Sequence, residues 1–164
     1  MERMLVGGGC FWCVEGAYKQ IRGVDSALPA YAGGHDERPT YRAVCSGTTG
    51  HAEIVEVVYD PQVIDYETLL EVFFTVHDPT QLNRQGNDVG TQYRSCIMPL
   101  NDTQRMLAES IIQRMEPHFD APIVTTIEEA IHFTIAEKEH HDYYARNPYQ
   151  GYCAAVVGPK IAKV

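Results

Sequence analysis

Apolar and polar positions along this 164-residue chain follow the two-residue repeat of strands in some stretches and the longer repeat of helices in others. An apolar run over residues 4–6 predicts a first strand, which leads into the three glycines 7–9. Beyond Cys10 the apolar positions repeat as one face of a helix: Val14, Ala17, Tyr18 and Ile21. The pattern predicts a strand, a tight turn and a helix, with Cys10 at or beside the first helical position.

The next part of the chain alternates in the same way. We expect an extended segment over residues 27–31, one or two helical turns over 39–45, and a clear strand over 53–59 that Asp60 and Pro61 end. Asp65 is the predicted N-cap of a helix. Its apolar positions are Tyr66, Leu69, Leu70, Phe73 and Val76 or His77.

The second half begins with a long polar stretch, residues 80–92, which we expect to be a functional loop. A strand is predicted over 93–98, a helix from Asn101 to Met115 with a capping-box-like start, a strand over 121–127 and a short helix over 137–146. Residues 147–164 are predicted to be a mobile coil tail. Few helices and several short strands favour an α+β two-layer sandwich with a mixed sheet, ferredoxin-like (split βαβ) with additions.

Composition and charge narrow the function. Hydrophobic residues make up 45% of the chain and charged residues 21%, as in ordinary globular proteins, and the length predicts one catalytic domain over residues 1–164. The net charge is −9 with no cluster of lysine or arginine, so we expect neither nucleic acid nor membrane as a partner. The first strand follows the initial methionine closely, which leaves no room for a signal peptide and predicts a cytoplasmic location.

Five cysteines, an odd number, suit catalytic or redox use better than a secreted disulfide framework. Cys10 and Cys13 form a single CxxC, as in thioredoxin-like oxidoreductases or in half of a zinc site. A zinc site would have to recruit His140, His141 or Cys153 from far away, so we expect no metal; an adjacent histidine pair is more typical of a solvated helix face. Two further cysteines are expected to be buried as small apolar side chains: Cys45 and Cys96.

A thiol at a helix N-terminus is a candidate nucleophile, because the free N–H groups and the helix dipole stabilise an anion there. The dipole lowers the pKa of such a thiol by at most about 1.5 units, so Cys10 would not ionise completely without a further contribution, such as bound substrate. Phe11 and Trp12 lie off the apolar stripe or at its edge. They either form a small apolar pocket beside Cys10 or cap the core.

One strand carries a second candidate. Glu53 shares its face with Val55, Val57 and Tyr59, so it is a single carboxylate on an otherwise apolar face. It is either an acid in a desolvated setting or an exposed residue at the mouth of the strand. Glu56 is a weaker candidate because it lies in the middle of the strand on the other face.

A series of short motifs now points to one family. In chain order they are Gly9-Cys10-Phe11-Trp12 with Glu15, Tyr31-Ala32-Gly33-Gly34, Pro39-Thr40-Tyr41, Gly50-His51-Ala52-Glu53, Tyr59-Asp60-Pro61, His77-Asp78-Pro79, Gln85-Gly86-Asn87-Asp88, Gly90-Thr91-Gln92-Tyr93-Arg94-Ser95, and Asn147-Pro148 with Gly151-Tyr152-Cys153. Together they resemble the type A peptide methionine sulfoxide reductases over nearly the whole chain. No single motif is specific, but the ordered combination is.

The resemblance implies reduction of the S epimer of methionine sulfoxide, free or in oxidised proteins, to methionine. It makes Cys10 the nucleophile and Glu53 the acid. Phe11 and Trp12 would form the pocket for the sulfoxide methyl group. Three polar residues would surround the sulfoxide and its departing oxygen: Tyr41, Asp88 and Tyr93.

The chemistry of the residues agrees with these roles. A thiolate that attacks a sulfoxide sulfur cannot expel bare oxide, so the oxygen must be protonated. A glutamate with the ordinary pKa is protonated in only about 0.2% of molecules at pH 7, whereas desolvation that raises the pKa near 7 makes it about half protonated. The apolar face around Glu53 could supply such a shift.

Oxygen transfer leaves Cys10 as a sulfenic acid, which condenses with a second thiol. Cys153 matches the family's Gly-Tyr-Cys tail and is the favoured resolving thiol. Cys13 stands where many members have glycine, and it could resolve the sulfenic acid directly or pass the disulfide on. The resemblance implies that thioredoxin or another dithiol reduces the final disulfide, with no bound cofactor.

Overall fold

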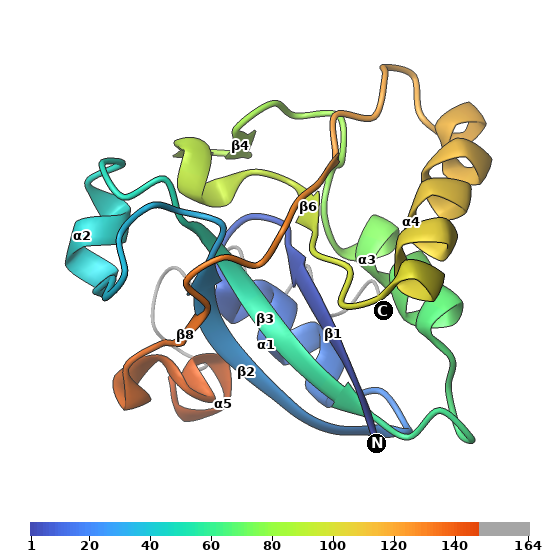
Figure 1. The fold of residues 1–164 in the computed structure, drawn as a ribbon, viewed down its shortest axis with the longest axis horizontal. Helices are drawn as coiled ribbons and strands as arrows, with labels where there is room; N and C mark the ends of the chain where they lie inside the picture. Colours follow the sequence, from blue (N-terminus) through green and yellow to red (C-terminus); the bar gives the residue numbers. More distant parts are fainter. Residues whose placement is uncertain (148–164) are drawn as a thin grey trace.

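The computed structural model describes residues 1–147, and its centre is a six-stranded sheet (Figure 1). The three long strands are β1 (Glu2–Gly7), β2 (Val24–Ala32) and β3 (Ala52–Tyr59). β3 lies between the other two and is antiparallel to both, so β1 and β2 run parallel to each other. Helix α1 (Phe11–Lys19) connects these two strands, which gives the split βαβ unit.

Three short strands extend the sheet: β6 (Cys96–Ile97), β7 (Thr126–Ile127) and β8 (Thr134–Ile135). The strand order is β7-β6-β1-β3-β2-β8. β6 and β7 pair in parallel, whereas the β1–β6 and β2–β8 pairs are antiparallel. The predicted α+β class with a mixed sheet is confirmed, and the inner order β6-β1-β3-β2 is the ferredoxin-like one.

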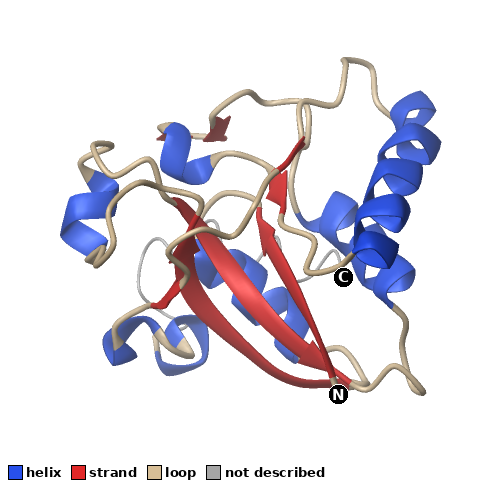
Figure 2. Cartoon of the chain, in the orientation of Figure 1, coloured by secondary structure: helices blue, strands red, loops and turns tan. Residues whose placement is uncertain are grey.

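Helices cover one face of the sheet (Figure 2). α1 and α3 (Tyr66–Val76) pack on this face and form the larger hydrophobic core. α4 (Asp102–Met115) packs against α3, and Arg114 of α4 pairs with Glu67 and Glu71 of α3 at 2.9 and 3.0 Å. Across residues 1–147, every helix is too short or too polar to cross a membrane.

Irregular chain covers the opposite face. Figure 1 shows the segment between β7 and β8 crossing the sheet on the side away from α1. Its Ala130 and Phe133 pack against the smaller core. The buried members of that core are Leu5, Ala30, Ala32, Ala52, Ile54, Cys96 and Met98. A helical layer and the sheet thus make the predicted two-layer sandwich, with coil in place of a third layer.

The predicted helix starts are confirmed by their caps. Asp65 accepts a hydrogen bond from the Thr68 N–H (2.7 Å), and Asn101 accepts one from the Gln104 N–H (2.8 Å). Gln104 in turn accepts from the Leu100 N–H at 3.0 Å, one residue before the position that a capping box uses. The short helix predicted over residues 39–45 is α2 (Tyr41–Cys45).

Three predicted segments differ in structure from the prediction. The strand over 93–98 shrinks to β6, because Thr91–Tyr93 form a 3₁₀ turn, and the strand over 121–127 shrinks to β7. The predicted 80–92 loop holds a small hairpin of β4 (Arg84–Gln85) and β5 (Asp88–Val89). β6 pairs with β1 and with β7 over two residues each, and within residues 1–147 β4 and β5 pair only with each other, so the apolar pattern of these segments does not translate into strand length.

The helix predicted over 137–146 is interrupted. It consists of a 3₁₀ turn, Lys138–His140, and α5 (Tyr143–Arg146). Asp142 separates them with φ of 59°, a left-handed conformation that no continuous helix contains. The Glu15 carboxylate accepts a hydrogen bond from the Asp142 N–H at 2.9 Å and thereby stabilises the break. The predicted coil tail lies outside the described residues, apart from Asn147, which ends α5.

Candidate active site

The turn between β1 and α1 is tightly enclosed by neighbouring side chains. Gly9 has φ of 90°, and a Cβ atom at this position would lie 2.7 Å from Cγ of Gln85. A Cβ atom on Gly8 would lie 2.9 Å from the His77 ring. Glycine is therefore required for the chain to pass this close to α3 and β4. The turn places Cys10 at the N-cap of α1, as predicted, with 6% of its surface exposed.

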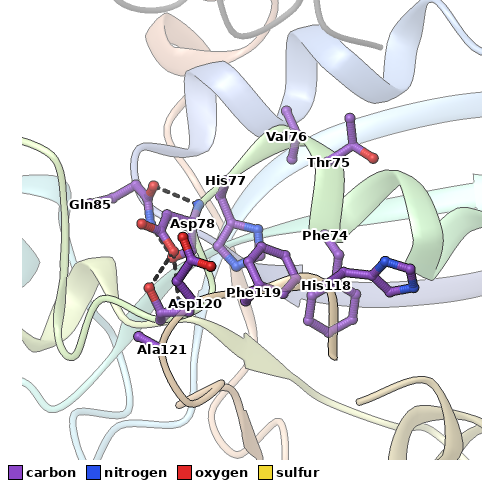
Figure 3. Close-up of a pocket in the computed structure, with 11 residues that line it drawn as sticks. Phe74, Thr75, Val76, His77, Asp78, Gln85, His118, Phe119, Asp120 and Ala121 are labelled. Atoms are coloured by element: carbon purple, nitrogen blue, oxygen red, sulfur yellow. Dashed lines mark hydrogen bonds between the residues drawn. The ribbon is translucent and has the colours of Figure 1, made fainter. Parts of the chain in front are cut away.

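Two residues that lie against this turn, His77 and Gln85, also line a pocket (Figure 3). It has a volume of about 480 Å³, and His77, Asp78 and Gln85 are among its lining residues. Gln85 accepts from the Asp78 N–H (2.8 Å) and donates to the Asp78 carbonyl (3.0 Å). None of the predicted site residues within 1–147 lines this pocket. His77 and Gln85 contribute to the site by their contact with Gly8 and Gly9.

The thiol of Cys10 is protonated in this structure. Burial raises its pKa well above the ordinary value, and the hydrogen bond with the Cys13 thiol and the charge of Glu53 act in the same direction. A hydrogen bond from the backbone N–H of Trp12 lowers the pKa of Cys10, but its effect is smaller than that of burial. The predicted lowering of the pKa at the helix N-terminus is therefore wrong for the protein without substrate, because desolvation outweighs the helix dipole.

Glu53 lies on β3 with 1% of its surface exposed, so the interpretation as an exposed residue at the strand mouth is wrong. Its Oε1 accepts from the Phe11 N–H at 3.2 Å, and its Oε2 has no hydrogen-bond partner within residues 1–147. Burial raises the pKa of Glu53 to about 8. The hydrogen bond from the Phe11 N–H lowers this pKa, whereas the charges of Asp88 and Cys13 raise it further. A pKa of 8 leaves about 90% of the carboxyl groups protonated at pH 7.

Tyr41 and Tyr93 lie close enough to Cys10 and Glu53 for the charges of both residues to raise the pKa of each phenol. Tyr41 begins α2, and Tyr93 lies in the 3₁₀ turn before β6. Burial raises the pKa of each phenol, and the Glu53 charge adds to this. Both hydroxyl groups thus keep their protons and can donate hydrogen bonds. Asp88, on β5, acts on Glu53 and Tyr93, so the structure brings the predicted polar residues together.

Phe11 and Trp12 differ in their surroundings. Phe11 is fully buried in the larger core, with its ring centroid 5.7 Å from that of Tyr31 and 6.1 Å from that of Tyr41. Trp12 is half-buried and stacks on Tyr143 with a centroid distance of 3.9 Å and an angle of 8°. Phe11 therefore contributes to the core in addition to any role beside Cys10.

His140 lies in the site, although its sequence position predicted a solvated helix face. It is 6% exposed, and its ring centroid is 4.2 Å from that of Tyr41. The Trp12 indole donates a hydrogen bond to Nδ1 of His140 at 3.3 Å. Burial lowers the pKa of His140, so the ring is neutral and its hydrogen is on Nε2. The interpretation of His140 as a solvated residue is wrong because β8 and the turn after it fold this segment onto α1 and α2.

The same segment contains three residues whose ligand atoms lie within 4.8 Å of one another: Glu137, Glu139 and His140. A histidine that binds a metal through Nε2 donates the N–H of its other nitrogen to an acceptor. Here Nδ1 of His140 accepts from Trp12 instead, which leaves Nε2 without a lone pair for a cation. The hydrogen-bond pattern thus disfavours a metal at this cluster.

The two remaining cysteines of the described chain, Cys45 and Cys96, differ in their exposure to solvent. Cys96 is fully buried, as predicted, but Cys45 is exposed, so the prediction of burial was wrong for Cys45. Burial raises the pKa of Cys45, while hydrogen bonds with Tyr41 and Tyr93 oppose this, so its thiol lies beside both phenols. Sequence reasoning missed this position because α2 is too short to show an apolar face. Cys153, a predicted site residue, lies outside the described residues.

Such a site suits reactions in which a sulfur nucleophile attacks an atom whose leaving group must be protonated. By its fold and site the protein is a thiol-dependent enzyme. The family model described as "Peptide methionine sulfoxide reductase" matches residues 2–164. The chain therefore belongs to the peptide methionine sulfoxide reductase family, and it is an oxidoreductase that uses thiols to reduce methionine sulfoxide.

Individual relatives and solved structures support the same family assignment. The chain is 55% identical over 166 residues to the peptide methionine sulfoxide reductase MsrA of Chromobacterium violaceum, covering 100% of this chain and 94% of that one. Methionine sulfoxide reductase A of Corynebacterium diphtheriae superposes with a TM-score of 0.87 at 38% identity, over 94% of this chain and 78% of that one. Reduced Mxr1 of Saccharomyces cerevisiae gives 0.86 at 35% identity, over 93% and 88%. Mxr1 has also been solved in complex with Trx2.

Proposed function

We propose that Cys10 attacks the sulfur of methionine-S-sulfoxide while Glu53 delivers a proton to the sulfoxide oxygen. The observation that carries this proposal is the buried Glu53 carboxyl group, whose Oε2 has no partner within residues 1–147 and whose pKa is raised to about 8. A neutral acid next to a thiol can donate to a leaving oxygen at neutral pH. The net reaction is Cys10–SH plus sulfoxide to Cys10–SOH plus sulfide, in which the sulfur of Cys10 is oxidised and that of methionine reduced, and the proton that the thiol loses replaces the one that Glu53 gives to the oxygen.

The polar residues assist the departing oxygen in this proposal. Tyr41 and Tyr93 donate hydrogen bonds to it without carrying charge. Asp88 helps to keep Glu53 protonated, because its negative charge raises the pKa of that carboxyl group. Phe11 and Trp12 surround the sulfoxide methyl group. The contacts of both rings with Tyr41 support this, since the centroid distances are 6.1 and 6.3 Å.

Two routes for recycling Cys10 stay open. The first uses Cys153, which lies outside the described residues and is favoured by the family's tail motif. The second uses Cys13, and its support is the hydrogen bond between the Cys13 and Cys10 thiols. In either route a thiol attacks Cys10–SOH, a disulfide forms and water leaves. Cys13 could also receive the bond and pass it to Cys153.

A dithiol closes the cycle by reducing the disulfide, and we propose thioredoxin in this role. The complex of Mxr1 with Trx2 supports it, although that structure is more distant, with a TM-score of 0.61 at 26% identity. The protein would need no bound cofactor. A thioredoxin-dependent cycle belongs in a reducing compartment, which fits the proposed cytoplasmic location. In this proposal residues 1–164 are one catalytic domain.

The proposal is tested with purified protein and dithiothreitol on the two epimers of a methionine sulfoxide substrate. We expect reduction of the S epimer and not of the R epimer, and loss of activity in Cys10→Ser. Full activity of Cys10→Ser would overturn the assignment of the nucleophile. A general dithiol oxidoreductase would instead reduce insulin disulfides and tolerate Glu53→Gln.

The recycling route is decided by mass spectrometry after one turnover without reductant. A disulfide between Cys10 and Cys153 supports the tail route. A disulfide confined to Cys10 and Cys13 refutes that route for the first step.

A further inference from the structure

Glu137 connects two elements of the site that are far apart in sequence. Its Oε1 accepts a hydrogen bond from the Tyr31 hydroxyl at 2.8 Å, and its Oε2 accepts one from the Tyr41 N–H at 3.0 Å. Tyr31 belongs to β2, and Tyr41 is the first residue of α2. One carboxylate therefore joins the sheet to the element that carries a phenol of the site.

Helix α2 depends on such contacts. It has five residues, which is too few for a helix to be stable by itself. Within α2 Val44 alone is buried, and the Thr40 cap satisfies the N–H of Ala43 but not that of Tyr41. The Tyr41 N–H bonds to Glu137 instead. The backbone position of Tyr41, and with it the reach of its hydroxyl, is held by this carboxylate.

The charge of Glu137 suits this role. Partial burial opposes ionisation, but the hydrogen bonds from the Tyr41 N–H and the Tyr31 hydroxyl lower the pKa of Glu137 below its ordinary value. An ionised carboxylate accepts stronger hydrogen bonds than a neutral amide. The 3₁₀ turn that follows Glu137 also places the His140 ring 4.2 Å from the Tyr41 ring.

We infer that Glu137 is a positioning residue for the sulfoxide reaction, acting through Tyr41. The inference rests on the proposed role of Tyr41 as a donor to the departing oxygen. Because that donor matters most when the oxygen carries developing charge, loss of Glu137 should lower kcat more than it raises KM.

The test is a double-mutant cycle with Glu137→Gln, Tyr41→Phe and the combined variant, assayed for kcat and KM on the S epimer. Gln keeps the size of the side chain but removes the charge. The matched control is Glu139→Gln, since Glu139 is 76% exposed and belongs to the same turn. Thermal melting of every variant measures folding separately.

We expect Glu137→Gln to lower kcat about tenfold with little change in KM, and Tyr41→Phe to lower it roughly 10- to 100-fold. The combined variant should be no worse than Tyr41→Phe, and Glu139→Gln should match the wild type. Equal losses from Glu137→Gln in both backgrounds would show a merely structural role and overturn the inference. Wild-type kcat in Glu137→Gln would also overturn it while leaving the proposed function intact. An inactive Cys10→Ser together with a fully active Tyr41→Phe would remove the role of Tyr41 and the inference with it, but not the nucleophile.

Discussion

Two glutamates that act on Tyr41 have opposite protonation states. Glu53 lies at the start of β3 with one hydrogen bond to Oε1 and no partner within residues 1–147 for Oε2. Glu137 accepts a hydrogen bond on each oxygen. Burial raises the pKa of Glu53 to about 8, whereas hydrogen bonding lowers the pKa of Glu137 despite its partial burial. The same side chain is thus a proton donor in one place and a fixed anion in the other, according to the donors around it.

Among the substitutions that test this difference, Glu53→Gln should have the largest effect. The amide has the shape of the neutral acid but cannot give up a proton, so we expect kcat to fall by roughly 10²- to 10⁴-fold at pH 7. The variant should remain folded, because the buried group is already neutral in the wild type. The measurement is steady-state reduction of the S epimer, with circular dichroism as the control for folding. Activity within a factor of two of the wild type would show that Glu53 is not the acid.

Glu53 and Glu137 should also change the stability of the protein with pH in opposite directions. Glu53 has its pKa raised from 4.5 to about 8. Its contribution to stability is therefore full below pH 4.5 and is lost as the pH rises towards 8, by on the order of 5 kcal/mol. Urea unfolding of wild type and Glu53→Gln between pH 5 and 9 should show the difference shrinking or reversing with pH. A difference that does not change with pH would contradict the raised pKa.

Two other glutamates bear on that measurement. Glu15 acts with the same sign as Glu53, because burial raises its pKa to about 7, so the wild-type curve alone contains both residues and the comparison with Glu53→Gln is needed. Glu137 acts with the opposite sign. Its lowered pKa adds stability above pH 4.5 that is lost on acidification. Glu137→Gln should flatten the acid side of the curve and leave the alkaline side unchanged.

The smallest effect is expected at Glu56, which is on the same strand as Glu53 but on its other face. Glu56 forms a salt bridge with Arg3 at 2.6 Å, and the Arg3 side chain is 45% exposed. Glu56→Gln should change the free energy of unfolding by at most about 1 kcal/mol and leave kcat as in the wild type. Denaturant unfolding and the sulfoxide assay check both values. A large loss of activity would mean that position on the strand, rather than burial, determines the role of Glu53.

Much of the fold was predictable because its long elements bury continuous faces. The strand at 53–59 and the helix capped by Asp65 have regular apolar repeats, and both occur as predicted. The short strands β6 and β7 were predicted too long, and β8 was missed. Each has two residues, so pairing with a neighbour decides them and no local repeat can show them.

The turn that carries Cys10 and the family motifs can be predicted from the sequence alone, since glycine spacing and apolar repeats act over a few residues. The sequence also pointed to Glu53 as a candidate acid, because one carboxylate on an apolar face stands out. The ionisation of that carboxylate and of the Cys10 thiol depends on the tertiary structure, because pKa values depend on burial and on donors from other elements. The tertiary structure likewise brought Glu137 and His140 to Tyr41 across about 100 residues of chain: Glu137 accepts a hydrogen bond from the Tyr41 N–H at a sequence separation of 96, and the His140 ring lies 4.2 Å from that of Tyr41. Contacts of that range leave no local pattern in the sequence.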